Sequence, residues 1–74
     1  MPKQISGRNQ LPGRIIALNF GDILAEVTVQ VGDQVVDAVI TRRSAENLKL
    51  AVGDPVTMLI KATEVMVIKD VSDD

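Results

Sequence analysis

Alternation of apolar and polar residues is the clearest pattern along this chain, and it is most regular over residues 24–31. Alanine and valine occupy every second position there, with leucine, glutamate, threonine and glutamine between them. A period of two predicts a β-strand with one buried face and one wetter face. Gly32 and Asp33 follow directly and predict a tight turn into another strand over residues 35–41, so the two strands are expected to form an antiparallel hairpin.

An earlier strand is expected over residues 14–20, shortly after Pro12. A proline does least harm near a strand start, because its missing N–H is not needed there. Side chains of a strand alternate between its two faces. Alternation places Ile15 and Ala17 on one face of this strand and Leu18 on the other.

A short helix and two more strands complete the predicted elements. Ser44 is a typical helix N-cap residue, and a helical turn through about residue 48 is expected to begin there. A fourth strand is expected over residues 56–61, and a fifth over residues 65–69 that is apolar on both sides, as in strands that meet protein on each face. These elements predict an all-β fold, a small five-stranded OB-like Greek-key barrel with one short helix.

The length of 74 residues leaves room for one domain, which we expect over residues 5–69, between an N-terminal tail (1–4) and an acidic C-terminal tail (70–74). The chain contains no cysteine, so disulfides cannot stabilise this domain. Hydrophobic residues make up 46% of the chain, and Phe20 is its one aromatic residue. So small a core cannot hide that much aliphatic surface, so burial between subunits is expected.

Charge and composition argue against several classes of function. The formal net charge is −2, without the basic patch or the aromatic platforms that nucleic-acid binding uses. No apolar run approaches the roughly 20 residues of a membrane span, and the N-terminus lacks a signal-peptide core, so a cytoplasmic location is expected. The absence of histidine and cysteine argues against a metal-ion site and against an enzyme. An OB-type nucleic-acid or oligosaccharide binder and a purely structural oligomerisation domain stay open as alternatives.

Two short polar segments, each beside a predicted strand, carry the donors that a tetrahedral oxyanion needs. Such an anion offers only acceptors, so its site must supply backbone N–H groups, hydroxyls and cations. An ordinary solvated turn is the alternative interpretation of each segment. We call the two segments the lips of a candidate anion site. They consist of Ser6, Gly7, Arg8 and Asn9 near the start of the chain, and of Lys61, Ala62 and Thr63 near its end.

Two hydroxyl-bearing residues near the end of the 35–41 strand are further candidates. Thr41 closes that strand, and its hydroxyl and the N–H groups of the following turn would suit an anion. Ser44 is open to two interpretations, because a serine at this place can cap the helix or contact the anion.

The order of four motifs resembles the molbindin family, the small molybdate-binding domains of the Mop or TOBE type. Residues 6–13, Ser-Gly-Arg-Asn-Gln-Leu-Pro-Gly, are similar to the Ser-Ala-Arg-Asn-Gln opening of that family. Gly7 stands where alanine is commoner, and both residues are small. The resemblance covers about residues 5–69. The other motifs lie at residues 38–44, 50–56 and 60–66.

The resemblance implies a non-catalytic protein that binds molybdate or tungstate for intracellular storage, with no cofactor. It also implies a homo-oligomer, expected to be a hexamer, and a contribution to the site from Thr41 of the same or a neighbouring chain. Because the lips lie at strand ends of a domain that needs partners, we expect the sites at subunit boundaries. The expected donors are the hydroxyls of Ser6 and Thr63, the backbone N–H groups of Gly7, Arg8 and Ala62, and the ammonium of Lys61, with Asn9 bracing its loop.

Overall fold

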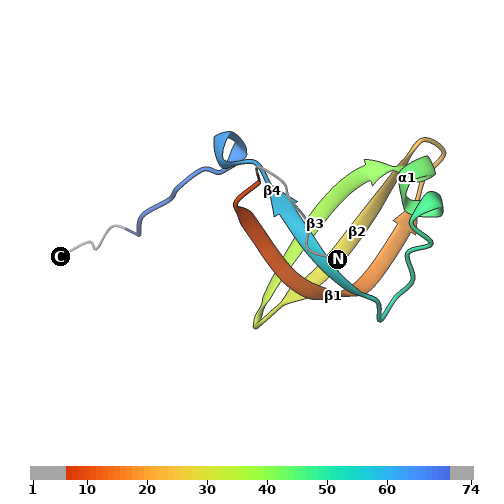
Figure 1. Cartoon of the computed structure of the whole chain (residues 1–74), viewed down its shortest axis with the longest axis horizontal. Helices are drawn as coiled ribbons and strands as arrows, with labels where there is room; N and C mark the ends of the chain where they lie inside the picture. The colour runs from red at the N-terminus through yellow and green to blue at the C-terminus, as the bar shows by residue number, and fades with distance from the viewer. Residues whose placement is uncertain (1–6, 71–74) are drawn as a thin grey trace.

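The computed structural model describes residues 7–70, which form one four-stranded antiparallel sheet (Figure 1). A six-residue helix follows the third strand, and one turn of 3-10 helix follows the fourth. The predicted all-β class with one short α-helix is therefore confirmed. The elements are β1 (Asn9–Phe20), β2 (Leu24–Val31), β3 (Gln34–Thr41), α1 (Arg42–Asn47), β4 (Pro55–Ile60) and η1 (Ala62–Glu64), and the spatial order of the strands is β3-β2-β1-β4.

The hairpin of β2 and β3 is the best-predicted part of the sheet. Val31 pairs with Gln34, which leaves Gly32 and Asp33 as the connecting turn. Gly32 has a φ of 60°, a conformation that glycine adopts without a steric penalty. The predicted antiparallel hairpin is confirmed.

β1 begins at Asn9 rather than at residue 14, because its first half pairs with β4. The register runs from Asn9 opposite Ile60 to Arg14 opposite Pro55. Pro12 consequently lies within the strand and not near its start. Its pairing partner is Thr57 of β4, whereas the ladder with β2 extends only from Arg14 onward. A proline is tolerated where a strand is paired on one side only.

A β-bulge at Ile16 changes which side chains of β1 face the core. Ile15 lies opposite Val29, but the register then shifts, so that Leu18 lies opposite Val27. Both partners belong to the buried cluster, and Leu18 packs against it together with Ile15. The prediction that Ile15 and Leu18 face opposite sides is therefore wrong, because one extra residue inverts the alternation.

The core is small and open on one side. Buried hydrophobic residues among those described are Ile15, Ala25, Val27, Val29 and Ala45. Inward-facing residues of the edge strands β3 and β4 are only half-buried. They line an apolar groove of about 490 Å³, which we call the open groove. Its walls include Val36, Ala38 and Ile40 of β3 and Val56, Met58 and Ile60 of β4, and Ile15, Val27 and Val29 form its floor.

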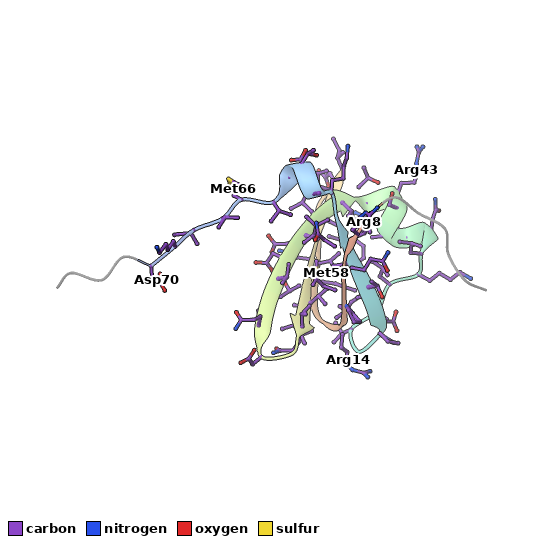
Figure 2. The ribbon with its side chains drawn as sticks, turned by 60° about the vertical axis from the view of Figure 1, so that its left-hand side comes forward. Arg8, Arg14, Arg43, Met58, Met66 and Asp70 are labelled. Carbon is purple, nitrogen blue, oxygen red and sulfur yellow. The ribbon has the colours of Figure 1, made fainter. Side chains whose placement is uncertain are left out.

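The predicted fifth strand is wrong for the described chain. Residues 65–70 are extended, belong to no ladder and leave the sheet after η1 (Figures 1 and 2). Met66, Val67 and Ile68 are 92%, 92% and 91% exposed. We call residues 65–69 the C-terminal arm. Because the arm pairs with no strand of its own chain, residues 7–70 contain four strands where the sequence predicted five. No helix in that range has the length and apolarity needed to cross a membrane.

Candidate functional site

The two lips meet at the end of the ladder between β1 and β4. Asn9 pairs with Ile60, and Arg8 and Lys61 are the next residues outward on the two strands. Antiparallel pairing thus brings together Gly7, Arg8 and Asn9 with the segment that begins at Lys61, although the two lie near opposite ends of the chain. Ser6, the remaining residue of the first lip, lies outside the described residues.

Two side-chain amides shape the first lip. The Nδ2 atom of Asn9 donates to the carbonyl oxygen of Ile60 over 3.2 Å and so ties this lip to β4. The Nε2 atom of Gln10 donates to the carbonyl oxygen of Gly7 over 3.0 Å. No role was predicted for Gln10, although its place in the 6–13 motif was a signal. Together the two bonds hold the backbone from Gly7 to Asn9 against the end of the sheet.

Gly7 packs closely over Leu59 of β4. A Cβ atom built on Gly7 would lie 2.5 Å from Cδ1 of Leu59, so a larger residue would require that side chain to move. Leu59 is 53% exposed and has room to do so. The glycine that departs from the commoner family pattern therefore lets this lip lie directly on the side chain of Leu59.

The second lip is the turn between β4 and the arm. The N–H of Glu64 donates to the carbonyl of Lys61 over 2.9 Å, which closes η1. The N–H groups of Ala62 and Thr63 open this turn and have no acceptor within it. Lys61, Ala62 and Thr63 are all exposed. This lip consequently presents an ammonium, two N–H groups and a hydroxyl to the surroundings.

The charge of the lips suits an anion. Arg8 and Lys61 are exposed, and within residues 7–70 neither forms an ion pair or a side-chain hydrogen bond. The same residues contain no group of three histidine, cysteine, aspartate or glutamate side chains arranged to hold a metal ion. Arg8 and Lys61 lie just beyond the last paired residues of their strands, so they bring positive charge to the same end of the ladder, and this charge would attract a dianion. The arrangement is therefore suited to holding an oxyanion at the surface of the sheet.

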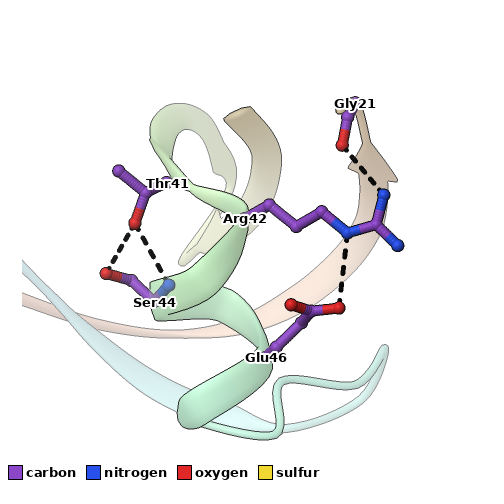
Figure 3. A network of polar contacts seen from close by, with 5 residues as sticks. All are labelled: Gly21, Thr41, Arg42, Ser44 and Glu46. Atoms are coloured by element: carbon purple, nitrogen blue, oxygen red, sulfur yellow. Dashed lines mark hydrogen bonds and ion pairs between the residues drawn. The ribbon is translucent and has the colours of Figure 1, made fainter. Parts of the chain in front are cut away.

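Thr41, and not Ser44, is the N-cap of α1 (Figure 3). The hydroxyl of Thr41 accepts a hydrogen bond from the backbone N–H of Ser44 over 3.1 Å and donates one to Oγ of Ser44 over 2.8 Å. The helix begins at Arg42 because Thr41 still has an extended backbone. The N-cap assignment of Ser44 is thus wrong by one turn, since the residue at the end of a strand is well placed to cap the helix that follows.

Thr41 and Ser44 lie away from the lips of their own chain. Thr41 pairs with Leu24, next to the pair formed by Phe20 and Ala25 at the far end of β1. The lips lie at the other end, beside Asn9. A site that contains both the lips and Thr41 therefore needs two copies of the chain.

Arg42 is held in place beside Thr41. Its Nε lies 3.3 Å from Oε2 of Glu46, its Nη1 donates to the carbonyl of Gly21 over 3.1 Å (Figure 3), and its guanidinium lies 5.8 Å from the ring centre of Phe20. These contacts engage the guanidinium within its own chain, which makes Arg42 a structural residue of the β1–α1 corner.

Comparison with known proteins gives a consistent result over nearly the whole chain. The model of the TOBE domain family matches residues 5–67. Molybdenum-pterin-binding protein 3 of Clostridium pasteurianum is 38% identical over 65 residues, which are 86% of this chain and 96% of that protein. The molybdenum transport protein ModE of Azotobacter vinelandii is 40% identical over 67 residues, and the match covers 89% of this chain but only 25% of that longer protein.

Two solved structures have the same fold. A molybdate binding protein from Sporomusa ovata superposes with a TM-score of 0.88 at 37% identity, and the match covers 90% of this chain and 100% of that one. MopII from Clostridium pasteurianum superposes with a TM-score of 0.84 at 34% identity, covering 89% of this chain and 100% of that one.

Proposed function

The chain belongs to the TOBE domain family, and from this membership we propose that it is a non-catalytic protein that binds molybdate at its lips. Similar proteins are named for binding molybdenum-pterin, and one similar structure is described as a molybdate binding protein. Tungstate is included in the proposal, because it is the close chemical analogue of molybdate. We further propose that binding serves intracellular storage of the anion in the cytoplasm, the location expected from the sequence.

The observation that carries the proposal is the meeting of the two lips at the end of the β1–β4 ladder. Arg8 and Lys61 bring positive charge to one place, and the opening N–H groups of η1 lie beside them. Asn9 supports the site by bonding to β4 and not by contacting the anion. Ser6 and Thr63 supply hydroxyls in this proposal, and Gly7 supplies a backbone N–H.

The exposure of the lips supports placing the site between copies of the chain. Arg8 and all three residues of the second lip are exposed in the single chain, so water would compete for every donor. A second copy would exclude that water, and it would also cover apolar side chains such as Val39 (61% exposed) and Ile23 (76%). We propose a homo-oligomer, a hexamer as the sequence resemblance implies, in which Thr41 or Ser44 of a neighbouring copy completes the donor set.

Calorimetric titration with molybdate, tungstate and sulfate, combined with native mass spectrometry, tests this function. We expect molybdate and tungstate to bind more tightly than sulfate, with a fixed number of anions per assembly. Equal weak heats for all three anions would refute selective binding. Assembly without any anion binding would favour the structural oligomerisation domain instead. Binding of a single-stranded oligonucleotide with a steep salt dependence would favour the nucleic-acid binder.

Substitution Lys61→Ala tests the second lip directly. A hydrogen bond to a charged group contributes about 1.5–3 kcal/mol, so we expect molybdate affinity to fall roughly tenfold or more while the assembly persists. Lys49→Asn is the matched control, because it removes one exposed lysine outside the lips, and asparagine tolerates the positive φ of 54° at that position. Loss of assembly with unchanged affinity per chain would contradict the role of Lys61.

A further inference from the structure

Gln10 holds the backbone of the first lip at one particular carbonyl. Its Nε2 atom donates to the carbonyl oxygen of Gly7 over 3.0 Å, three residues back along the chain. This carbonyl belongs to the peptide group that joins Gly7 to Arg8, which is planar and trans like every peptide group of the described residues. The C=O and the N–H of a trans peptide group point in opposite directions. The bond from Gln10 therefore also fixes the direction of the N–H of Arg8, which points away from the Gln10 amide.

Leu59 provides a second point of contact for the same segment. Gln10 and Leu59 lie directly opposite each other in the β1–β4 ladder, so their side chains stand on the same face of the sheet. Both are exposed, whereas Met58, the preceding residue of β4, packs against the core on the other face. Gly7 packs against Leu59 and accepts the hydrogen bond from Gln10. The first lip thus folds back over the outer face of the ladder and is held there at two points.

The N–H of Arg8 is available to a ligand. Within residues 7–70 it donates to no backbone or side-chain acceptor, and Arg8 itself is exposed. Lys61 follows β4 with an extended backbone, so alternation places its side chain on the outer face, together with that of Leu59. The N–H that Gln10 orients and the ammonium of Lys61 therefore lie at the same end of the ladder, on its outer face.

We propose that Gln10 is a positioning residue of the anion site, which directs the N–H of Arg8 toward the bound oxyanion without contacting the anion. Without this bond the peptide group between Gly7 and Arg8 could turn over, because glycine adopts both signs of φ without a steric penalty. The turned group would present its carbonyl oxygen to the anion, and two groups that offer only lone pairs repel each other. The bond from Gln10 prevents this rotation.

The same bond also strengthens the donor. A hydrogen bond accepted by the carbonyl polarises its peptide group, so the N–H at the other end becomes a better donor. Gln10 consequently sets both the direction and the strength of one donor of the site. This role rests on the proposed function, since it concerns the same anion site.

Gln10→Met tests the proposal, because methionine is similar in length and carries no donor. In calorimetric titration the affinity for molybdate should fall about two- to tenfold, the range of one neutral hydrogen bond. Gln30→Met is the matched control, since Nε2 of Gln30 donates to the carbonyl oxygen of Gly32 over 2.8 Å in the β2–β3 turn, outside the lips. The control variant should keep the natural affinity. Native mass spectrometry should show the same assembly for both variants and the natural chain.

Nuclear magnetic resonance of isotope-labelled protein observes the peptide group itself. An HNCO spectrum correlates the N–H of Arg8 with the carbonyl carbon of Gly7 in a single peak. In the natural chain, molybdate should move this peak to lower field in its proton dimension, as expected when the N–H donates to an anion. Gln10→Met should move the peak in its carbon dimension before any anion is added, and it should reduce the proton shift that molybdate causes. Gln30→Met should have neither effect.

The outcomes separate the positioning role from the proposed function. Natural affinity in Gln10→Met would overturn the positioning role and leave the proposed function intact. A lower affinity with an unmoved Gly7–Arg8 peak, or with a broken assembly, would show that Gln10 acts elsewhere and would overturn the positioning role as well. If the natural chain itself binds no molybdate, the proposed function fails and the positioning role fails with it.

Discussion

Gly13 of β1 lies close against β2, and there is no space for a side chain. A Cβ atom on Gly13 would collide with the carbonyl oxygen of Gln30 and would lie 2.7 Å from Cγ1 of Val29. The first of these neighbours is backbone, and the second belongs to a side chain that is 1% exposed. Relief would therefore require the two strands to move apart.

Gly13→Ala should lower the free energy of unfolding by about 1–3 kcal/mol, the usual cost of overpacking. Gly7→Ala is the matched control, since its new methyl group meets only the mobile side chain of Leu59, and we expect a smaller loss. Chemical denaturation of both variants measures the difference. Equal losses would show that the close approach at Gly13 relaxes without cost.

The cap of α1 gives a second test at a single residue. Thr41→Val removes the hydroxyl that accepts the N–H of Ser44 and should cost about 1 kcal/mol of stability. Ser44→Ala should cost less, because it leaves that bond in place. Thermal unfolding measures the stability loss of each variant. A larger loss for Ser44→Ala than for Thr41→Val would indicate that Ser44 is the cap. The sequence pattern predicted Ser44 as the cap, and the error arose because strand end and helix start are adjacent here.

Among the strands, periodic patterns predicted the pairing of segments that are close along the chain. The hairpin of β2 and β3 follows from alternation and from Gly32-Asp33, and the structure agrees. The bulge at Ile16 could not be predicted in the same way, because an extra residue in an apolar run leaves no gap in the pattern. Residues 65–69 were predicted to form a fifth strand, but they pair with no strand within residues 7–70, because composition does not specify a pairing partner.

The candidate site was predictable to a similar extent. The donor chemistry of the lips is visible in the sequence, and their meeting follows from the pairing of β1 with β4. The supporting bond of Gln10 was missed, because a backbone carbonyl as its acceptor has no signature in the sequence. The separation of Thr41 from the lips could not be predicted either, because it depends on which end of β1 each segment lies beside.

The whole molecule is less compact than its length allows. The Cα radius of gyration is 14.6 Å, against about 11 Å expected for a compact chain of this size. The hydrophobic content of 46% contrasts with a core of a few small aliphatic residues. Many of the large apolar side chains of the described residues are therefore left exposed in the single chain.

Thermal stability should consequently depend on chain concentration and on the anion. We expect the melting temperature to rise as protein concentration increases, because association stabilises the folded chain by mass action. Molybdate at a concentration one hundred times its dissociation constant should raise the free energy of unfolding by about 2.7 kcal/mol, and sulfate should raise it less. Scanning calorimetry over a range of dilutions measures both effects. A melting temperature that is independent of dilution would indicate a chain that is stable alone.

The exposed arm also makes the newly made chain prone to aggregation. Val65, Met66, Val67 and Ile68 form a short run with high β-propensity and no charge, the kind of segment that stacks into cross-β fibrils. Glu64 precedes this run, and Lys69 and Asp70 follow it, so charges flank it on both sides as gatekeepers against self-stacking. In the single chain these three charges oppose self-stacking, so removing them should promote fibril growth before it affects the folded sheet.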